Sequence, residues 1–301
     1  MFAAKKLNQL SEDAIRVLMG IEQGMRRFEF VPVNHIAFFA RFDKEKTKYL
    51  LDKVHKLGVV YRFKGINRGD PISYILNYEG YDILALHAFY SKNIIKSIGN
   101  IRGKGKESDV YECLLFNGDQ AIIKFHRLGR ISFRNIKKLR SYITKQKHLN
   151  WLYMSRLSAH REYEALNLIQ SKNLDFKVPK VYGWNRHAIV LSLLYGDELY
   201  KFNEINEPVK IFEEILDQYY KIYTNVGIIH GDLGEFNVIL SPNNDIMIID
   251  WPQWVSKDHP HAQQYLKRDI ENITEFFKRK YKLEIDVDSI LYKFLKSEFD
   301  K

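Results

Sequence analysis

The chain has 301 residues, of which 46% are hydrophobic and 14% aromatic, and its formal charge is +10 at neutral pH. This supply of apolar side chains excludes an intrinsically disordered chain. The single cysteine excludes an internal disulfide framework and a cysteine-based zinc site, and no apolar run approaches the ~18 residues of a membrane span. We therefore expect a cytoplasmic protein without membrane contact, and the excess of cations predicts a polyanionic partner.

Helices are predicted near the start of the chain, over residues 11–27, 33–40 and 44–58. The first opens on Ser11, a favourable N-cap, and the third ends on Gly58, which suits a helix C-terminus. Apolar residues recur at helical spacing in the first and third segments, so each is expected to bury one face.

Two short β-type runs, residues 59–65 and 73–78, follow these helices and are joined by turn-forming residues. Three helices followed by a β-ribbon is the layout of a winged helix-turn-helix, in which the third helix reads a nucleic-acid groove. Three cations lie away from the apolar face of that helix and are candidates for nucleic-acid contact: Lys46, Lys53 and Lys56. A domain of this type also serves protein contacts, and that alternative stays open.

A helix over residues 79–93 leads into a predicted strand–turn–strand, residues 98–126. The residues of its turn that we assign to nucleotide binding are Gly103, Gly105, Lys106 and Ser108. Glycine-rich turns let backbone N–H groups approach phosphate oxygens closely. The Walker A pattern does not fit, because Glu107 stands where Ser or Thr is required. The pattern therefore favours a kinase-type lid over a nucleotide.

A lysine ends the next apolar run, at Lys124. A lysine in such a place needs an anion, and in kinase-like sites its partners are the nucleotide phosphates and a helical glutamate. The predicted helix over residues 155–170 offers Glu162 and Glu164 for that role.

Two acids end apolar runs further along the chain, Asp232 in HGDLGEFN and Asp250 in IMIID. Asp232 and Asn237 are spaced as in a kinase catalytic loop, and Asp250 takes the place of the metal-binding aspartate. We expect Asp232 to orient the proton of the attacking hydroxyl or water. Asn237 and Asp250 are expected to hold Mg²⁺ or Mn²⁺, and this cation would compensate acids that we expect to be buried.

The segment 120–161 contains no acid but eleven lysines and arginines, which include Arg127 and Arg161. We interpret these cations as phosphate-binding and predict that residues 127–147 form a mobile insertion near the nucleotide. Its candidate nucleic-acid contacts are Arg130, Arg134, Lys137 and Lys138. Its candidate autophosphorylation sites are Ser132 and Ser141.

With these residues in place, the chain resembles the Rio family of atypical serine protein kinases, in its winged-helix-bearing branch. The motifs that carry the resemblance span both halves of the chain: GKGKESDVY, KFHRLGRISFR, HGDLGEFN and IDWPQWV. The family's pattern of Glu followed by an aromatic residue favours Glu162 over Glu164. The chain departs from the family at Trp251, where Phe is usual, and in the hinge segment, which lacks the expected Met-Glu pair.

The resemblance implies an α+β fold, with a winged helix-turn-helix domain over residues 1–90 and a compact bilobal kinase-like domain over residues 91–301. The lobes would divide near residue 193. It also implies an ATP- and Mg²⁺-dependent serine kinase or ATPase of archaeal type that acts in late maturation of the small ribosomal subunit and contacts its rRNA. A phospho-aspartate would form at Asp250, and Ser108 would touch the phosphates.

Two other classes of function remain open at this point. A small-molecule phosphotransferase of the aminoglycoside or choline kinase type has a similar HGD…N…IDW pattern, but 51 residues after Asp250 leave little room for its substrate lobe. A nucleic-acid-binding scaffold with an inactive nucleotide pocket is the second alternative, and the intact set of catalytic residues disfavours it.

Overall fold

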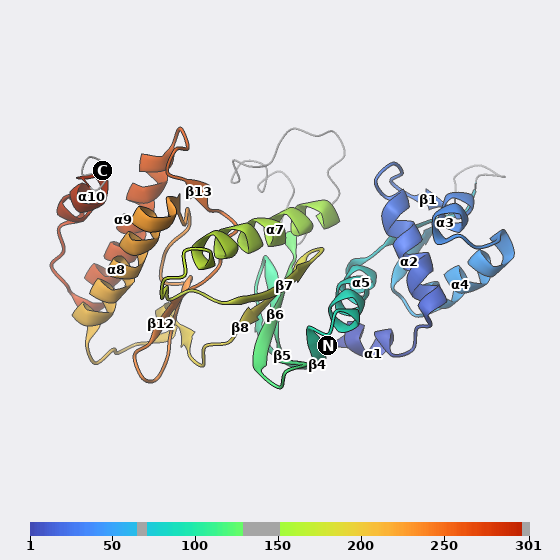
Figure 1. Cartoon of the computed structure of the whole chain (residues 1–301), viewed down its shortest axis with the longest axis horizontal. Coiled ribbons are helices and arrows are strands. Elements are labelled where there is room, and N and C mark those ends of the chain that lie inside the picture. Colours follow the sequence, from blue (N-terminus) through green and yellow to red (C-terminus); the bar gives the residue numbers. More distant parts are fainter. Residues whose placement is uncertain (65–70, 129–150, 297–301) are drawn as a thin grey trace. The chain divides into compact units, whose positions relative to one another are not determined.

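The structure is a computed structural model of the whole chain, and it describes residues 1–64, 71–128 and 151–296 (Figure 1). The chain divides into two compact units. The first comprises residues 1–131, 148–155 and 185–188, and the second comprises residues 132–147, 156–184 and 189–301. Each unit is described by itself.

The first unit begins with a winged helix-turn-helix, as the sequence predicts (Figure 1). Its helices are α1 (Phe2–Leu7), α2 (Glu12–Gly24), α3 (Val33–Ala40) and α4 (Lys44–Lys56). Its antiparallel sheet has the order β1-β3-β2, from strands β1 (Val31–Pro32), β2 (Val60–Phe63) and β3 (Ser73–Leu76). The sequence prediction missed α1 and β1, because elements of six and two residues are too short to show a period.

Local signals set the helix ends in this domain. The Ser11 hydroxyl accepts from the Ala14 N–H at 3.3 Å, so the predicted N-cap of α2 is confirmed. Gly58, with φ +74°, follows α4 in the left-handed conformation that favours glycine. Apolar side chains on α2 and α4, among them Leu18 and Leu51, are fully buried and form the core of the domain.

The next helix, α5 (Tyr78–Ser91), leads to an antiparallel meander of β4 (Ile95–Lys104), β5 (Ser108–Leu115) and β6 (Gln120–His126). The sheet continues with β7 (Val181–Asn185) and β8 (Ala188–Ser192) in the order β4-β5-β6-β8-β7. The turn between β7 and β8 belongs to the first unit, where the His126 N–H donates to the His187 carbonyl at 2.8 Å.

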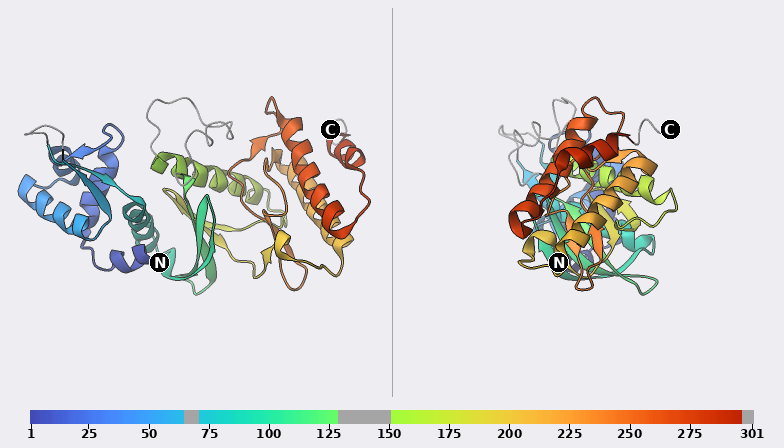
Figure 2. Two further views of the ribbon diagram at one scale, coloured as in Figure 1. Left: turned by 180° about the vertical axis from the view of Figure 1, so that it is seen from behind. Right: turned by 90° about the vertical axis from the view of Figure 1, so that its left-hand side faces the viewer.

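The second unit is built around two helices, α8 (Pro208–Val226) and α9 (Ala262–Tyr281), which lie side by side (Figures 1 and 2). Short strands pack beside them in the orders β12-β11-β9 and β10-β13. These are β9 (Asp197–Glu198), β10 (Ile228–Ile229), β11 (Val238–Leu240), β12 (Ile246–Ile248) and β13 (Val255–Ser256). The unit also holds most of α7 (Trp151–Gln170), the short η2 (Leu199–Lys201) and α10 (Val287–Lys296).

Among the described residues, no helix has both the length and the apolar character that a membrane span requires.

In the second unit the strands are short, and the loops that follow β10 and β12 carry Asp232 and Asp250. The two apolar runs therefore do form strands, but Asp232 lies three residues and Asp250 two residues after the strand ends.

Candidate active site

The glycine turn forms a hairpin between β4 and β5 in the first unit. Its turn closes where the Gly105 N–H donates to the Ser108 carbonyl at 2.8 Å. Gly103 pairs with Val110 across the hairpin, and apart from Gly103 and its two chain neighbours no heavy atom of the described residues lies within 4 Å of the point where a Cβ would stand at Gly103. The backbone is therefore open to close approach at this position. Lys106 is exposed at the tip.

Lys124 lies in β6 directly opposite Val110, which in turn lies opposite Gly103. Opposed residues of antiparallel strands point to the same face of a sheet. The register thus places the open side of Gly103 and the Lys124 side chain on one face. Lys124 is 7% exposed, and a lysine buried to that degree needs an anionic partner.

A buried ionic cluster, made of Asp82, Asp109, Arg127 and His187, supports this hairpin from the first unit. The Arg127 guanidinium donates to both carboxylate oxygens of Asp82 at 2.6 and 2.8 Å, and its Nε donates to Asp109 at 2.9 Å. The Arg127 N–H donates to the Glu107 carbonyl at 2.6 Å. The cluster therefore connects α5 to the start of β5 and to the end of β6.

The charges in the cluster compensate one another. Burial alone would raise the pKa of Asp82, but Arg127 and His187 outweigh it, so the pKa of this carboxyl lies below its usual range. Burial lowers the pKa of the His187 imidazole to about 4. The cluster is therefore one arginine with two carboxylates and a neutral histidine near pH 7.

The sequence prediction for Arg127 is wrong. We expected it to begin a mobile, phosphate-binding insertion, but it is 3% exposed and held by Asp82 and Asp109. The prediction counted acids within the segment, whereas these partners come from elsewhere in the chain. The remaining predicted contacts of the insertion lie outside the described residues: Arg130, Ser132, Arg134, Lys137, Lys138 and Ser141.

The predicted catalytic loop, which we call the catalytic loop, follows β10 in the second unit. Asp232 is exposed, and one of its carboxylate oxygens accepts from the Gln253 side-chain amide at 3.2 Å. The Asn237 side-chain NH₂ donates to the Asp232 carbonyl at 2.7 Å. This bond engages the Asn237 NH₂, so the amide oxygen is the atom with which this side chain would bind a metal ion.

The predicted metal-binding loop, which we call the metal loop, contains Asp250, two residues after the end of β12. Asp250 has φ +67°, a left-handed conformation that is strained in residues other than glycine and is typical of functional sites. Trp251 is fully buried, and its indole N–H donates to the Ile248 carbonyl at 3.1 Å. Nε2 of His230 lies 2.9 Å from the Ile249 carbonyl, so it joins the catalytic loop to the metal loop.

The expectation that both acids are buried is wrong. Asp232 is exposed and Asp250 is half-buried. The strands before them end early enough that each acid lies in a loop, where water reaches it. A cation at this site would therefore not be required to stabilise the fold.

Sequence reasoning missed Asp269 of α9, whose side chain binds the backbone of the catalytic loop. Its buried carboxylate accepts from the Gly231 N–H at 2.8 Å, the Leu233 N–H at 3.0 Å and the Tyr219 hydroxyl at 2.7 Å. Burial raises the pKa of Asp269 to about 7, against the opposing effect of these donors. A signal was present, since Asp269 occupies an inward position of the helix between Leu266 and Ile273, which are buried.

The donor set fits Mg²⁺ bound mainly through a nucleotide. Among the described residues, no group of three or more His, Cys, Asp or Glu side chains forms a metal cluster. Mg²⁺ commonly uses one or two carboxylates, together with water and substrate phosphates. The Asp250 carboxylate and the Asn237 amide oxygen match that requirement.

Glu162 lies in α7 and is 1% exposed. It belongs to the second unit, whereas Lys124 belongs to the first, so the pairing of these two side chains stays a prediction. Burial of both groups agrees with the expectation that each meets an opposite charge.

The predicted nucleic-acid contacts on α4 differ in their surroundings. Lys46 forms an ion pair with Asp13 at 2.7 Å and lies 4.2 Å above the Phe42 ring. Lys53 lies 4.4 Å above the exposed Tyr49 ring, and Lys56 is exposed. The charge of Lys46 is thus partly used within the protein.

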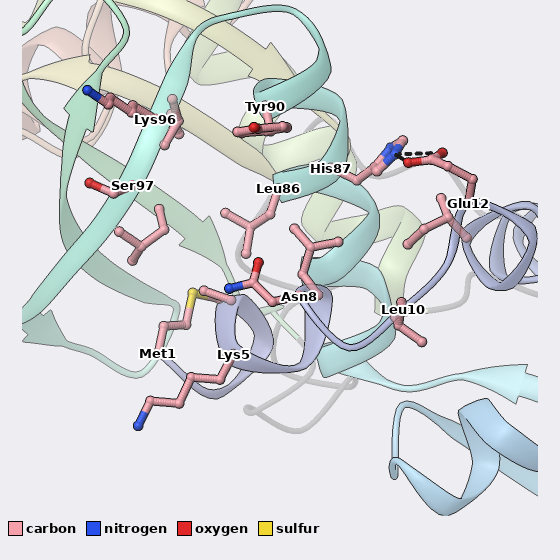
Figure 3. A pocket seen from close by; sticks show the side chains of 15 residues that line it. Met1, Lys5, Asn8, Leu10, Glu12, Leu86, His87, Tyr90, Lys96 and Ser97 are labelled. Carbon is pink, nitrogen blue, oxygen red and sulfur yellow. Dashed lines mark hydrogen bonds and ion pairs between the residues drawn. The ribbon is translucent and has the colours of Figure 1, made fainter.

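A pocket of about 510 Å³ lies elsewhere in the first unit, between α1, α5 and the start of β4 (Figure 3). Leu86 and Ile95 are among the residues that line it, as are His87 and Glu12, whose side chains lie 3.2 Å apart. None of the residues predicted for nucleotide chemistry lines it, so the pocket is separate from the candidate active site.

Comparisons with known proteins agree with the arrangement of the two halves. A family model described as "RIO domain" matches residues 109–290, and one described as "Rio2, N-terminal" matches residues 7–92. The RIO-type serine/threonine-protein kinase Rio2 of Methanocaldococcus jannaschii is 43% identical over 276 residues, which cover 88% of this chain and 98% of that protein.

Longer relatives match over part of their length. The serine/threonine-protein kinase rio2 of Dictyostelium discoideum is 36% identical over 277 residues, which cover 92% of this chain and 52% of that protein. The crystal structure of the Rio2 kinase–ADP/Mg²⁺–phosphoaspartate complex from Chaetomium thermophilum is similar with a TM-score of 0.79 and 30% identity, over 96% of this chain and 88% of that one.

Proposed function

The chain belongs to the RIO family, and from this premise we propose that it is a RIO-type serine/threonine kinase that uses ATP and Mg²⁺. The observation that carries the proposal is the linked pair of loops in the second unit. His230 joins them at the Ile249 carbonyl, Gln253 joins them at Asp232, and Asn237 is turned by its bond to Asp232.

In this proposal each named side chain has one task. The hairpin at Gly103, Gly105, Lys106 and Ser108 covers the ATP phosphates with its backbone N–H groups. Lys124 binds the phosphates, and Glu162 orients Lys124. Asp232, exposed and hydrogen-bonded by Gln253, accepts or orients the proton of the attacking hydroxyl or water.

Asn237 and Asp250 would hold Mg²⁺ through their side-chain oxygens. When bound, the metal ion would offset the negative charge that develops on the phosphate during transfer. The left-handed backbone at Asp250, with φ +67°, sets the direction in which its side chain leaves the chain, and Asp250 lies between β12 and buried Trp251.

We propose further that turnover passes through a phospho-aspartate at Asp250, since the similar Chaetomium thermophilum Rio2 kinase forms an ADP/Mg²⁺–phosphoaspartate complex. One Asp250 oxygen would form a bond to the γ-phosphorus while the bond to ADP breaks. Water would then hydrolyse the acyl phosphate and restore the carboxylate. Self-phosphorylation on serine would use the same site, and Ser132 and Ser141 remain the candidates.

The proposed biological setting is late maturation of the small ribosomal subunit in the cytoplasm. It is supported by the resemblance of both domains to the Rio2 branch, by the winged helix-turn-helix and by the formal charge of +10. Small-subunit rRNA is the proposed polyanionic partner, because a chain of this charge attracts phosphate backbone.

Replacement of the metal aspartate tests the enzymatic proposal. Asp250→Ala should reduce Mg²⁺-dependent ATP turnover by ~10²-fold or more, an effect typical of removing a group that stabilises transition-state charge. The matched control is Asp245→Ala, which removes an exposed acid from the turn between β11 and β12. Undiminished turnover in Asp250→Ala would remove this residue from the site.

Trapping experiments test the intermediate. Protein denatured during turnover with γ-labelled ATP should carry label that hydroxylamine releases, because hydroxylamine attacks acyl phosphates but leaves phosphoserine intact. Label that resists hydroxylamine would argue against a phospho-aspartate while leaving the kinase proposal in place.

A further inference from the structure

Arg161 of α7 contacts the loop that follows Asp250, within the second unit. Its Nε donates to the Pro252 carbonyl at 2.9 Å, and its Nη2 donates to the Trp254 carbonyl. The Trp254 indole N–H donates back to the Arg161 carbonyl at 2.9 Å, and the guanidinium lies 5.0 Å from the centre of the Trp254 ring. One residue of a helix is therefore joined to two residues of a loop by hydrogen bonds in both directions.

The contacted residues are placed where they control the chemistry of the proposed site. Pro252 and Trp254 flank Gln253, whose side chain donates to the Asp232 carboxylate. Pro252 also lies two residues after Asp250, at the end of the strained turn. A shift of this loop would therefore move a metal ligand and the hydrogen bond to the catalytic aspartate together.

The helix end of the contact is equally informative. Arg161 directly precedes Glu162, the buried glutamate that we assign to Lys124. Because consecutive residues of one helix move together, the loop position and the glutamate position are coupled through Arg161 and Trp254.

The geometry points to Arg161 as a positioning residue that holds the metal loop in its Mg²⁺-binding conformation and couples that loop to α7. This inference rests on the proposed function, since it assumes that Asp250 binds the metal. It also corrects the sequence prediction for Arg161, which counted it among cations free to bind phosphate. Two of its donors are engaged by main-chain carbonyls instead.

An arginine suits this role better than a lysine. The guanidinium presents several N–H donors in a rigid plane, so Nε and Nη2 can reach two carbonyls at once. A lysine ammonium is a single point at the end of a flexible stem, and it would hold one carbonyl with less directional control. Arg161→Lys is therefore an informative variant, because it keeps the positive charge but removes the planar pair of donors that reaches two carbonyls.

The test measures ADP binding by calorimetry in the presence and absence of Mg²⁺, together with the Mg²⁺ concentration that gives half-maximal ATP turnover. For Arg161→Met we expect the half-maximal Mg²⁺ concentration to rise at least about tenfold, whereas ADP binding without Mg²⁺ stays within about twofold of the parent. For Arg161→Lys, the half-maximal Mg²⁺ concentration should lie between those of the parent and Arg161→Met. The matched control is Lys221→Met, an exposed cation on α8 that pairs with Asp217.

A second variant keeps the test informative if Arg161→Met does not fold. Trp254→Phe keeps an aromatic ring beside the guanidinium and removes the N–H that donates to the Arg161 carbonyl, so it should raise the half-maximal Mg²⁺ concentration by roughly two- to fivefold. Unchanged Mg²⁺ dependence in folded Arg161→Lys and Trp254→Phe would overturn the inference. So would an equal loss of ADP binding with and without Mg²⁺, which would mean a general effect on the fold.

Failure of the inference differs from failure of the proposed function. If Asp250→Ala reduces turnover as expected while the Arg161 variants keep the parent's Mg²⁺ dependence, the positioning role alone is wrong. If Asp250→Ala leaves turnover intact, the assignment of the metal loop is wrong, and the inference falls with it.

Discussion

Two buried aspartates show contrasting ways of stabilising a carboxyl group inside this protein. Asp82, in the first unit, meets the Arg127 guanidinium through two hydrogen bonds, and its pKa lies below the usual range. Asp269, in the second unit, accepts from a tyrosine hydroxyl and two backbone N–H groups, and burial raises its pKa to about 7. In the first case the attraction of Arg127, with His187, outweighs burial; in the second, neutral hydrogen-bond donors and a smaller effect of the Arg268 charge offset burial incompletely.

The difference matches what each aspartate holds in place. The Asp82 cluster joins a helix to strands and keeps its charges at every pH near neutrality. Asp269 holds the catalytic loop through main-chain donors at Gly231 and Leu233, on either side of Asp232. Main-chain N–H groups hold this carboxylate, and the Arg268 guanidinium, which donates to the Gly231 carbonyl, adds a smaller electrostatic attraction.

Removal of the compensating cation should have the largest effect on stability. Arg127→Met leaves two carboxylates, Asp82 and Asp109, buried beside each other without a cation, which costs on the order of 3–5 kcal/mol. Urea unfolding would measure the loss. The double variant Arg127→Met with Asp82→Asn should be less destabilised than the sum of the single changes, and additive losses would show that the pair is not coupled.

Replacement of Asp269 should affect ATP turnover more than it affects stability. Asp269→Asn puts an amide NH₂ where a carboxylate oxygen accepted a hydrogen bond, and a buried donor left unsatisfied costs about 1–3 kcal/mol. We expect steady-state ATP turnover to fall roughly tenfold to hundredfold at about pH 8, as the loop around Asp232 loosens. Asp217→Asn, at an exposed position on α8, is the control and should retain the parent's rate.

The two regions should respond to pH with opposite signs. His187 has a pKa of about 4 in the folded protein, against 6.5 in the unfolded chain. Between these two pH values the unfolded chain binds one more proton at this residue, so the contribution of His187 to stability rises with pH. Asp269 has a pKa of about 7 in the fold against 3.8 when unfolded, so the folded chain binds the extra proton and stability falls as pH rises.

The contributions of His187 and Asp269 therefore cancel in part between pH 4 and pH 6.5. Asp269→Asn removes the falling one, so its unfolding free energy should rise more steeply with pH than that of the parent, by up to about 1.4 kcal/mol per pH unit. Urea midpoints at a series of pH values give the two slopes. Parallel curves for parent and variant would mean that Asp269 does not hold a proton in this range.

These contrasts also mark what the sequence can and cannot predict. Local signals predict the ends of helices, the glycine hairpin and the acids after β10 and β12, because each depends on residues within a few positions. Arg127 and Arg161 were misassigned because their partners lie 45 and 91 residues away along the chain. Composition within a segment says nothing about partners at that separation.

Asp269 is an intermediate case. Its inward position follows from the helical period of α9, but its role depends on which backbone N–H groups the fold brings above it. An acid within an apolar helical stripe thus indicates that hydrogen-bond donors lie nearby, although the sequence does not show which groups these are.

The smallest effects should come from exposed charges, where water screens both attraction and burial costs. Lys46 and its partner Asp13 are 43% and 41% exposed, and a pair of this kind contributes ~0–1 kcal/mol to stability. Lys46→Ala should therefore leave the urea midpoint nearly unchanged. Its effect belongs instead to the proposed rRNA contact of α4.

That contact distinguishes Lys46 from Lys56, which is exposed on the same helix. Each phosphate neutralised by a cation adds ~0.7–0.9 to the slope of log K against log salt. Lys56→Ala should flatten the slope for small-subunit rRNA by about that amount, and Lys46→Ala should flatten it less, because Asp13 already offsets part of the Lys46 charge. Asp13→Asn should then strengthen binding by releasing Lys46. Equal slopes for all three variants and the parent would place the rRNA contact away from α4.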